Sequence, residues 1–189
     1  MKSIANLLFE ARKLKELPRS GYAFLGAGNE TVAEHSFMTT FIAFVMARME
    51  TDINEQRLTS MCLVHDLPEA RTGDLNYVQK EYVTANEEKA VKDLSRTLPF
   101  GQLFADLIDE FNQGETKEAR LAHDADQLSF VLELKALADI GYDPPKAWLT
   151  AVISRLKTDT GKKLSETIID TQWDEWWRKN IIDRDNGNQ

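Results

Sequence analysis

Residues 65–74, HDLPEARTGD, decide how we interpret this chain. They follow an apolar stretch of helical spacing and begin with an imidazole and a carboxylate, His65 and Asp66. A second carboxylate, Glu69, comes three residues after Asp66, and a third, Asp74, follows a glycine. Charged groups at the end of an apolar helix are costly to bury unless something compensates their charge. We therefore expect a divalent metal ion here, with further ligands elsewhere in the chain.

Two more side chains of metal-binding type lie in apolar surroundings. His35 lies near the start of one predicted helix, and Asp126 interrupts the apolar face of a long one. A single histidine on an apolar helix face is more often structural than a ligand, so the hypothesis rests on the combination. With His65 and Asp66 these side chains form a mixed nitrogen and oxygen set on three helices. Without a thiolate, such a set suits Mn, Fe, Co, Ni or Zn, and Mg less well.

Apolar residues at helical spacing predict an all-α fold. The expected helices cover about residues 3–16, 31–50, 54–65, 69–73, 86–98, 101–112, 117–140, 144–156 and 163–179. Thr31 begins a capping box, TVAE, at the start of the second of these helices. Pro68 can begin a short helix, because proline fits the first helical turn, and Gly73 can end it. We expect loops over 18–29 and 75–85.

The predicted organisation is a single domain over residues 1–182, including a C-terminal helix, followed by a polar tail over 183–189. The face of the second helix that we expect to be buried comprises Met38, Phe41, Ile42, Val45, Met46 and Met49. The segment 173–177 carries three tryptophans at helical spacing. We interpret it first as a helix face that covers the core, and second as an interface.

Composition narrows the possible partners and compartment. The chain has 189 residues, with 23 basic and 31 acidic side chains and a formal net charge of −8. That excess of negative charge argues against nucleic-acid polymers and anionic membranes as partners. No apolar run approaches the ~18 residues of a membrane span. The single cysteine, Cys62, excludes an internal disulfide and favours a reducing, cytoplasmic location.

In chain order, His35, His65-Asp66 and Asp126 resemble the H…HD…D signature of the HD-domain metal-dependent phosphohydrolases. More narrowly, the residues that follow the HD pair, together with PRSGY before VAEHS, resemble the bacterial 5′-deoxynucleotidases and their eukaryotic HD-domain relatives. The similarity spans roughly residues 5–140. It implies an HD-domain helical bundle, a homodimer, and hydrolysis of deoxynucleoside 5′-monophosphates to deoxynucleosides and phosphate.

The resemblance also implies roles for individual residues. His35, His65, Asp66 and Asp126 correspond to the metal ligands. Glu69 corresponds to an acidic residue essential for activity, which orients or deprotonates the attacking water. We therefore take Glu69 and Asp66 as the catalytic candidates. If the turn after His65 is helical, Glu69 projects from the same side, since residues four apart are neighbours on a helix.

Three further residues are candidates for substrate binding. Arg19 corresponds to an arginine that contacts the phosphate, and a guanidinium can hold a phosphate through two parallel hydrogen bonds. Asp74 corresponds to a position near the 3′ side of the sugar, although an aspartate after glycine is also a common turn residue. His123 stands where relatives often have lysine. It is expected to contact phosphate or a second ion, or else to hydrogen-bond Asp124.

The leading interpretation is a phosphomonoesterase in which a water activated by the metal attacks phosphorus in line. One alternative is a phosphodiesterase or pyrophosphohydrolase acting on another nucleotide. The Gly-Tyr-Pro motif of the cyclic-dinucleotide branch is missing, which argues against that branch. A second alternative is a non-catalytic, nucleotide-sensing dimeric module with an idle site.

Overall fold

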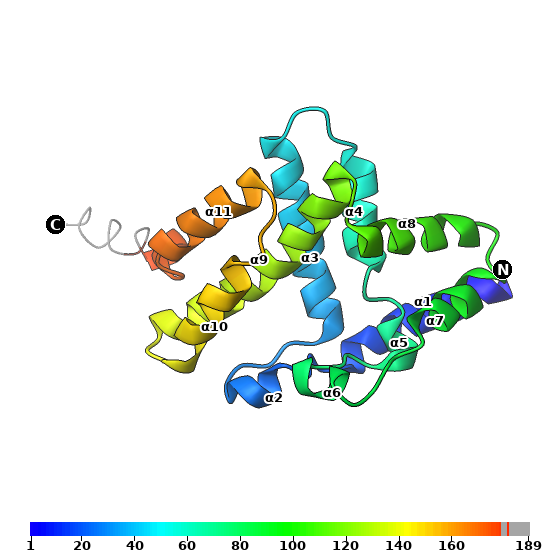
Figure 1. The fold of residues 1–189 in the computed structure, drawn as a ribbon, viewed down its shortest axis with the longest axis horizontal. Coiled ribbons are helices and arrows are strands. Elements are labelled where there is room, and N and C mark those ends of the chain that lie inside the picture. Colours follow the sequence, from blue (N-terminus) through cyan, green and yellow to red (C-terminus); the bar gives the residue numbers. More distant parts are fainter. Residues whose placement is uncertain (179–180, 182–189) are drawn as a thin grey trace.

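The computed structural model describes residues 1–178 and 181, and over these residues the chain is helical with no strand (Figure 1). The helices are α1 (Lys2–Lys13), η1 (Leu14–Glu16), α2 (Tyr22–Leu25), α3 (Val32–Met49), α4 (Glu55–Val64), α5 (Glu69–Thr72), α6 (Tyr77–Lys80), α7 (Glu87–Ser95), α8 (Gly101–Gln113), α9 (Lys117–Asp139), α10 (Pro144–Ile153) and α11 (Asp159–Asp170). The predicted all-α class is confirmed. The single domain over 1–182 stays a prediction, and the predicted tail 183–189 lies outside the described residues.

Helices α3 and α9 cross at the centre of the molecule, and α4 packs against both (Figure 1). Helices α10 and α11 lie against α9 on one side, while α8 lies against α4 and carries α7 on the other. The core between α3, α4 and α9 is closed by large, fully buried side chains that include Met46, Met61 and Leu128. This crossing is the frame on which the polar residues of the site are mounted.

Local sequence signals account for where the central helices begin and end. The Thr31 hydroxyl accepts from the Glu34 amide while the Glu34 carboxylate accepts from Thr31, which is the predicted capping box. Pro68 precedes α5 with φ −58°, a value that its ring imposes in any case. Gly73 ends α5 at φ 78°, where a side chain would be strained. These predicted boundaries are confirmed.

Two predicted loops contain single helical turns. The stretch 18–29 includes α2, and the stretch 75–85 includes α6. The second turn has a local cause, because Asn76 and Gln79 form a reciprocal cap at its start. Each turn is too short to show a helical periodicity of apolar residues, so the sequence pattern did not predict either turn. The prediction of unbroken loops was wrong at both places.

The C-terminal helix differs from its predicted bounds of 163–179. Helix α11 begins at Asp159 behind the cap Thr158, and it ends at Asp170. The tryptophan segment 173–177 therefore does not continue this helix, although residues 175–178 are helical again. The backbone amide of Trp173 donates to Asp139 at the end of α9, at 3.0 Å. This tertiary hydrogen bond forms just after the end of α11. The helical spacing of the tryptophans did not predict that the helix ends before them.

Helix α3 buries only part of the face that we predicted, since Ile42 and Met46 are buried as expected. Phe41, Val45 and Met49 are exposed by 54, 37 and 45%, so their predicted burial was wrong. Around Ile42 and Met46, the inward face carries mostly small and polar residues, namely Val32, His35, Ser36, Thr39, Ala43 and Ala47. Small residues let α3 approach α4 and α9 closely, and His35 must face the crossing. The side opposite the crossing therefore exposes aromatic rings to the surface.

A buried carboxylate attaches α11 to α9. Asp124 is fully buried and accepts hydrogen bonds from the amides of Lys157 and Thr158, both at 2.8 Å, and from the Thr158 hydroxyl at 2.6 Å. A Cβ on Gly161 would lie 2.3 Å from an Asp124 oxygen, so only glycine fits there. Since hydrogen bonds to a charged group contribute about 1.5–3 kcal/mol each, this carboxylate is a main anchor of α11.

We expect Asp124→Asn to lower the free energy of unfolding by about 2–4 kcal/mol, because its amide NH₂ would face donors. The matched control is Asp159→Asn in the exposed first turn of α11. That change removes only a helix-dipole interaction, with a cost of about 0.3–1 kcal/mol. Urea unfolding of both variants measures the difference. Equal losses of stability would contradict the anchoring role.

Candidate metal centre

His65 is held from behind by the backbone of its own helix. It is the C-terminal cap of α4, and its Nδ1 lies 2.8 Å from the carbonyl oxygen of Cys62. A carbonyl only accepts, so Nδ1 must carry the proton that it donates. The other ring nitrogen, Nε2, is therefore turned toward the interior, where it is buried without a hydrogen-bond partner. This is the orientation of a histidine that ligates through Nε2.

Three helices bring four polar side chains together at the crossing. His35 comes from α3, and its Nε2 lies 2.9 Å from Asp126 Oδ1 of α9 and 3.6 Å from Asp66 Oδ2. His65 Nε2 lies 3.3 Å from the same Asp66 oxygen. His35, His65 and Asp126 each offer one ligand atom within 4.8 Å of the others. Three of the four predicted ligands thus form one group, and Asp66, which is outside it, lies within 3.6 Å of both imidazoles.

The electrostatics of this cluster favour positive charge. Burial by itself lowers the pKa of His65, but Asp66 and Asp126 outweigh it and raise the pKa to about 9. Burial raises the pKa of Asp126, yet its hydrogen bond and charge interaction with His35 bring it well below the ordinary value. A proton on His65 occupies the space that a cation would take. Metal binding must displace that proton, because ligating imidazole is neutral.

Both the donor set and the charge balance fit a divalent cation. Four carboxyl groups raise the pKa of the Arg19 guanidinium through their charges, namely Asp66, Asp126, Asp74 and Glu69. Two imidazoles and two carboxylates without a thiolate suit a first-row divalent metal. The unpartnered Nε2 of His65 supplies a lone pair at the centre. The cluster therefore has more negative charge than its own side chains balance.

Glu69 lies at the edge of this cluster, at the first position of α5. Its Oε2 is buried and has no hydrogen-bond partner. Burial, and after it the charges of Asp66 and Asp74, raise the pKa of Glu69 to about 8. A cation in the cluster would oppose this rise, because positive charge favours the carboxylate. An unpartnered carboxyl group beside a metal-binding cluster is available to a water or a substrate.

The loop before α2 brings Arg19 to the same place. Its Nη1 donates to Asp66 Oδ2 at 3.3 Å, and its Nε lies 4.0 Å from Asp74 Oδ2. The Asp74 carboxylate also accepts from the Ser20 amide at 2.7 Å. Burial lowers the pKa of Arg19, but the carboxylates around it raise it above the ordinary value. The guanidinium therefore faces the cluster as a permanent cation, and Asp74 holds the loop that carries it.

The structure places His123 apart from these residues. Its Nε2 lies 2.7 Å from the carbonyl oxygen of Phe111, and its ring stacks on the Phe111 ring with centroids 4.2 Å apart. The other side of Phe111 meets His65, at 4.9 Å between centroids. Within the part of the chain that the structure describes, His123 forms no hydrogen bond with Asp124 or with the cluster, and its proposed substrate contact stays a prediction.

Sequence reasoning missed two side chains near the cluster. Glu30 is buried, with its Oε2 3.9 Å from His35 Nδ1 and 3.4 Å from the hydroxyl of Tyr22 that donates to it. Burial raises the pKa of Glu30 to about 7. Phe111 packs between His65 and His123. The one sequence signal was an acidic residue directly before the cap of the His35 helix, and Phe111 gave none.

Comparisons of this chain with known proteins agree on one family. A family model described as HD domain matches residues 11–168. The human protein named 5′-deoxynucleotidase HDDC2 is 26% identical over 149 residues, which are 76% of this chain and 72% of that protein. The Escherichia coli protein named 5′-deoxynucleotidase YfbR is 30% identical over 119 residues, 55% of this chain and 59% of that one. A solved structure of a conserved hypothetical protein from Pyrococcus furiosus is 26% identical, with a TM-score of 0.72 over 88% of this chain and 99% of that chain.

We expect the metal-free protein to bind one Co²⁺ per chain, and His65→Ala to weaken that affinity by at least about 100-fold. Changes outside the ligand set alone cost 10- to 100-fold, and losing a ligand costs more. Calorimetric titration against a competing chelator measures both. The matched control is His123→Gln, which removes a histidine one ring away from His65 and should leave the affinity within a few-fold. Similar losses in both variants would refute this ligand assignment.

Proposed function

This chain belongs to the HD-domain family, and we propose that it is a metal-dependent phosphohydrolase that converts deoxynucleoside 5′-monophosphates to deoxynucleosides and phosphate. The observation that supports the proposal is the group of His35, His65 and Asp126, with Asp66 next to His35, an unpartnered carboxyl group and a guanidinium. The relatives named 5′-deoxynucleotidases support the substrate class, a small nucleotide.

The cofactor is a divalent metal ion, with His35, His65, Asp66 and Asp126 as its proposed ligands. When bound, such an ion polarises a phosphoryl oxygen and lowers the pKa of water near it. Asp66 has a second task, because its Oδ2 also accepts from Arg19 Nη1. It therefore ties the position of the guanidinium to that of the ligand set.

The other proposed roles follow from placement and charge. Glu69, with its free Oε2, orients the attacking water and accepts a proton from it. Arg19 takes up the negative charge that develops on the phosphoryl oxygens, as a fixed cation in a site that excludes much of the solvent. Asp74 holds the Arg19 loop through Ser20 and lies beside the place of the sugar. Hydrolysis of phosphate monoesters is very slow without a catalyst, so several such devices are needed together.

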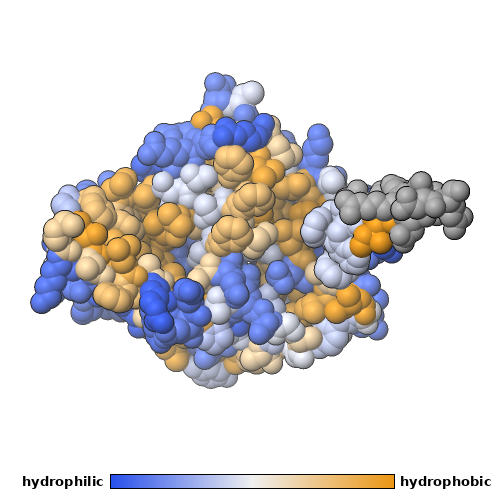
Figure 2. All heavy atoms as spheres, turned by 180° about the vertical axis from the view of Figure 1, so that it is seen from behind, coloured by the Kyte–Doolittle hydropathy of each residue, from blue (hydrophilic) through white to orange (hydrophobic). Residues whose placement is uncertain are grey.

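We further infer that two copies of the chain associate through the exposed side of α3. Phe37, Phe41 and Phe44 form a row there, with neighbouring ring centroids 6.3 Å apart, and we call this row the phenylalanine face. The three side chains are exposed by 65, 54 and 41%. The row forms one wall of a groove of about 710 Å³ that α1, α3 and α4 line. Apolar residues gather over the left and centre of the molecule as seen in Figure 2.

A second copy is the occupant that fits this surface best. An apolar groove with a row of exposed rings along its wall can pack against the same surface of a second copy, as a twofold interface requires. Among the residues that line the groove, only Glu55 is charged, and it is paired with Arg48. The phenylalanine face with Leu8 and Leu63 exposes on the order of 500 Å², more than half of the ~800 Å² per partner of a standard interface.

Phosphate release from the deoxynucleoside and ribonucleoside 5′-monophosphates, with Mn²⁺, Co²⁺, Mg²⁺ or Zn²⁺, tests the proposed activity. We expect release from deoxynucleotides with at least one of these metals. Glu69→Gln should lower kcat by about 10²–10⁴-fold while Co²⁺ affinity is kept. The control is Glu166→Gln on the exposed surface of α11. A wild-type protein that binds metal and releases no phosphate would support the nucleotide-sensing alternative instead.

Light scattering after size exclusion tests the dimer. We expect a dimer for the wild type, and at least ~100-fold weaker association for Phe41→Asp, because a buried carboxylate without a partner costs several kcal/mol. Tyr82→Asp is the matched control, since Tyr82 is an aromatic residue exposed by 85% outside the groove. A wild-type monomer, or equal effects of the two substitutions, would exclude this interface.

A further inference from the structure

The two imidazoles of the cluster are supported unequally. A histidine that ligates a metal through one ring nitrogen usually donates its other N–H to a carboxylate or a carbonyl, which fixes the ring. His65 has such a partner in the carbonyl oxygen of Cys62. His35 has none, because its Nδ1 is buried and makes no hydrogen bond, although its Nε2 faces Asp126 and Asp66. The outer side of His35 therefore requires an acceptor.

Glu30 is the carboxylate that lies on that side. Its Oε2 is 3.9 Å from His35 Nδ1, and the two side chains are 6% and 1% exposed. A contraction of about 1 Å would bring the pair to the usual N–H···O distance. The pair is thus enclosed and almost in bonding contact.

Two hydrogen bonds and the helix cap that follows it hold Glu30 in this place. The Tyr22 hydroxyl donates to the same Oε2 at 3.4 Å, and the Tyr22 ring is buried against Phe130. The carbonyl oxygen of Glu30 accepts from the Arg19 amide at 2.8 Å. The next residue, Thr31, is the cap of α3. One short segment therefore joins the loop of the proposed phosphate-binding arginine to the helix of the proposed ligand.

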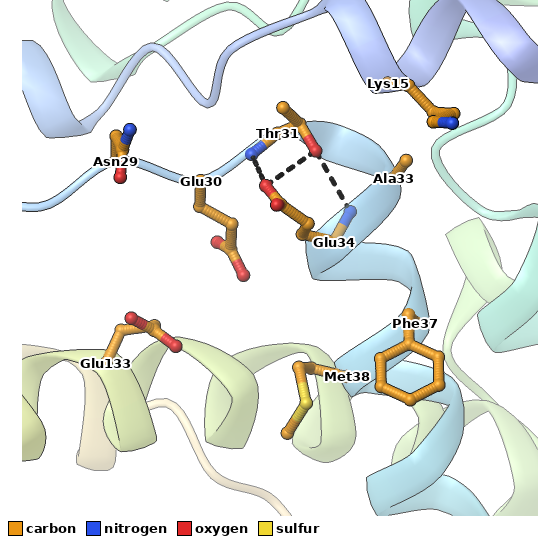
Figure 3. A pocket seen from close by; sticks show the side chains of 9 residues that line it. All are labelled: Lys15, Asn29, Glu30, Thr31, Ala33, Glu34, Phe37, Met38 and Glu133. Atoms are coloured by element: carbon orange, nitrogen blue, oxygen red, sulfur yellow. Dashed lines mark hydrogen bonds between the residues drawn. The ribbon is translucent and has the colours of Figure 1, made fainter.

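Glu30 also borders a cavity of about 620 Å³ that lies outside the cluster. Figure 3 shows its carboxylate pointing across this cavity toward Glu133 of α9. Among the described residues Glu133 forms no ion pair with His35, whereas Glu30 lies 3.9 Å from it. The two carboxylates share a cavity but differ in their access to the imidazole, and this difference makes Glu133 a matched control.

We propose that Glu30 is a positioning residue of the metal centre, which accepts the Nδ1–H of His35 and thereby presents Nε2 to the ion. This inference rests on the proposed metal-dependent function. A proton kept on Nδ1 leaves the Nε2 lone pair free, and a carboxylate behind the ring makes it a stronger donor. Tyr22 keeps Glu30 in place. Because the carbonyl oxygen of Glu30 accepts from the Arg19 amide, the same segment also fixes the distance between the His35 imidazole and the Arg19 guanidinium.

Calorimetric titration of the metal-free protein with Co²⁺ tests this proposal. We expect Glu30→Ala to weaken Co²⁺ affinity by about 10- to 100-fold. Glu30→Gln should keep most of the affinity, because its amide oxygen still accepts a hydrogen bond. Glu133→Gln should match the wild type. Wild-type affinity in Glu30→Ala would overturn the proposal.

A second measurement separates positioning from a general loss of structure. In nitrogen-15 NMR spectra of the metal-free protein, the His35 Nδ1–H should resonate downfield in the wild type and in Glu30→Gln, and should move upfield or exchange away in Glu30→Ala. An unchanged His35 signal in Glu30→Ala would overturn the proposal. If the wild type bound no metal, the proposed function would fail, while this spectrum would still decide whether Glu30 bonds His35.

Discussion

The structure depends on an excess of negative charge that is brought together where α3, α4 and α9 meet. One carboxylate oxygen of Asp66 and one of Asp126 lie close to Nε2 of His35. The guanidinium of Arg19 is the permanent cation beside them. Such a group of charges is costly to bury unless it is balanced. A divalent ion supplies the missing charge and uses the lone pairs that the protein leaves unpaired. The same need for balance explains why His65 has a raised pKa when no ion competes with its proton.

Contacts with the rest of the fold fix the orientation of these groups. A backbone carbonyl holds His65, and Phe111 packs on its ring. The loop that carries Arg19 is fixed by Asp74 and by the backbone of Glu30. Residues distant in sequence thus help to fix the segments that carry His65 and Arg19. Small displacements of this kind of support alter catalysis, because the reacting groups must be placed within fractions of an ångström.

The orientation of α3 connects the site to the surface. Since His35 and the small residues of α3 face the crossing, the phenylalanine face must point the other way. An apolar patch of about 500 Å² is comparable to the largest patch on a typical monomer, and such patches are often functional. The helix therefore has a polar side that contributes His35 to the cluster and an apolar side that is exposed at the surface.

The sequence by itself determined the helical class, the caps Thr31 and Asn54, and the break at Pro68 and Gly73, because these are local preferences of neighbouring residues. It also indicated the four polar side chains that meet at the crossing, since they interrupt apolar patterns. Only the tertiary structure decided which face of α3 is buried, where the tryptophan segment leaves α11, and that His123 stacks on Phe111. It alone brought Glu30 to His35. These features depend on contacts between residues far apart in the chain, and local spacing carries no information about them.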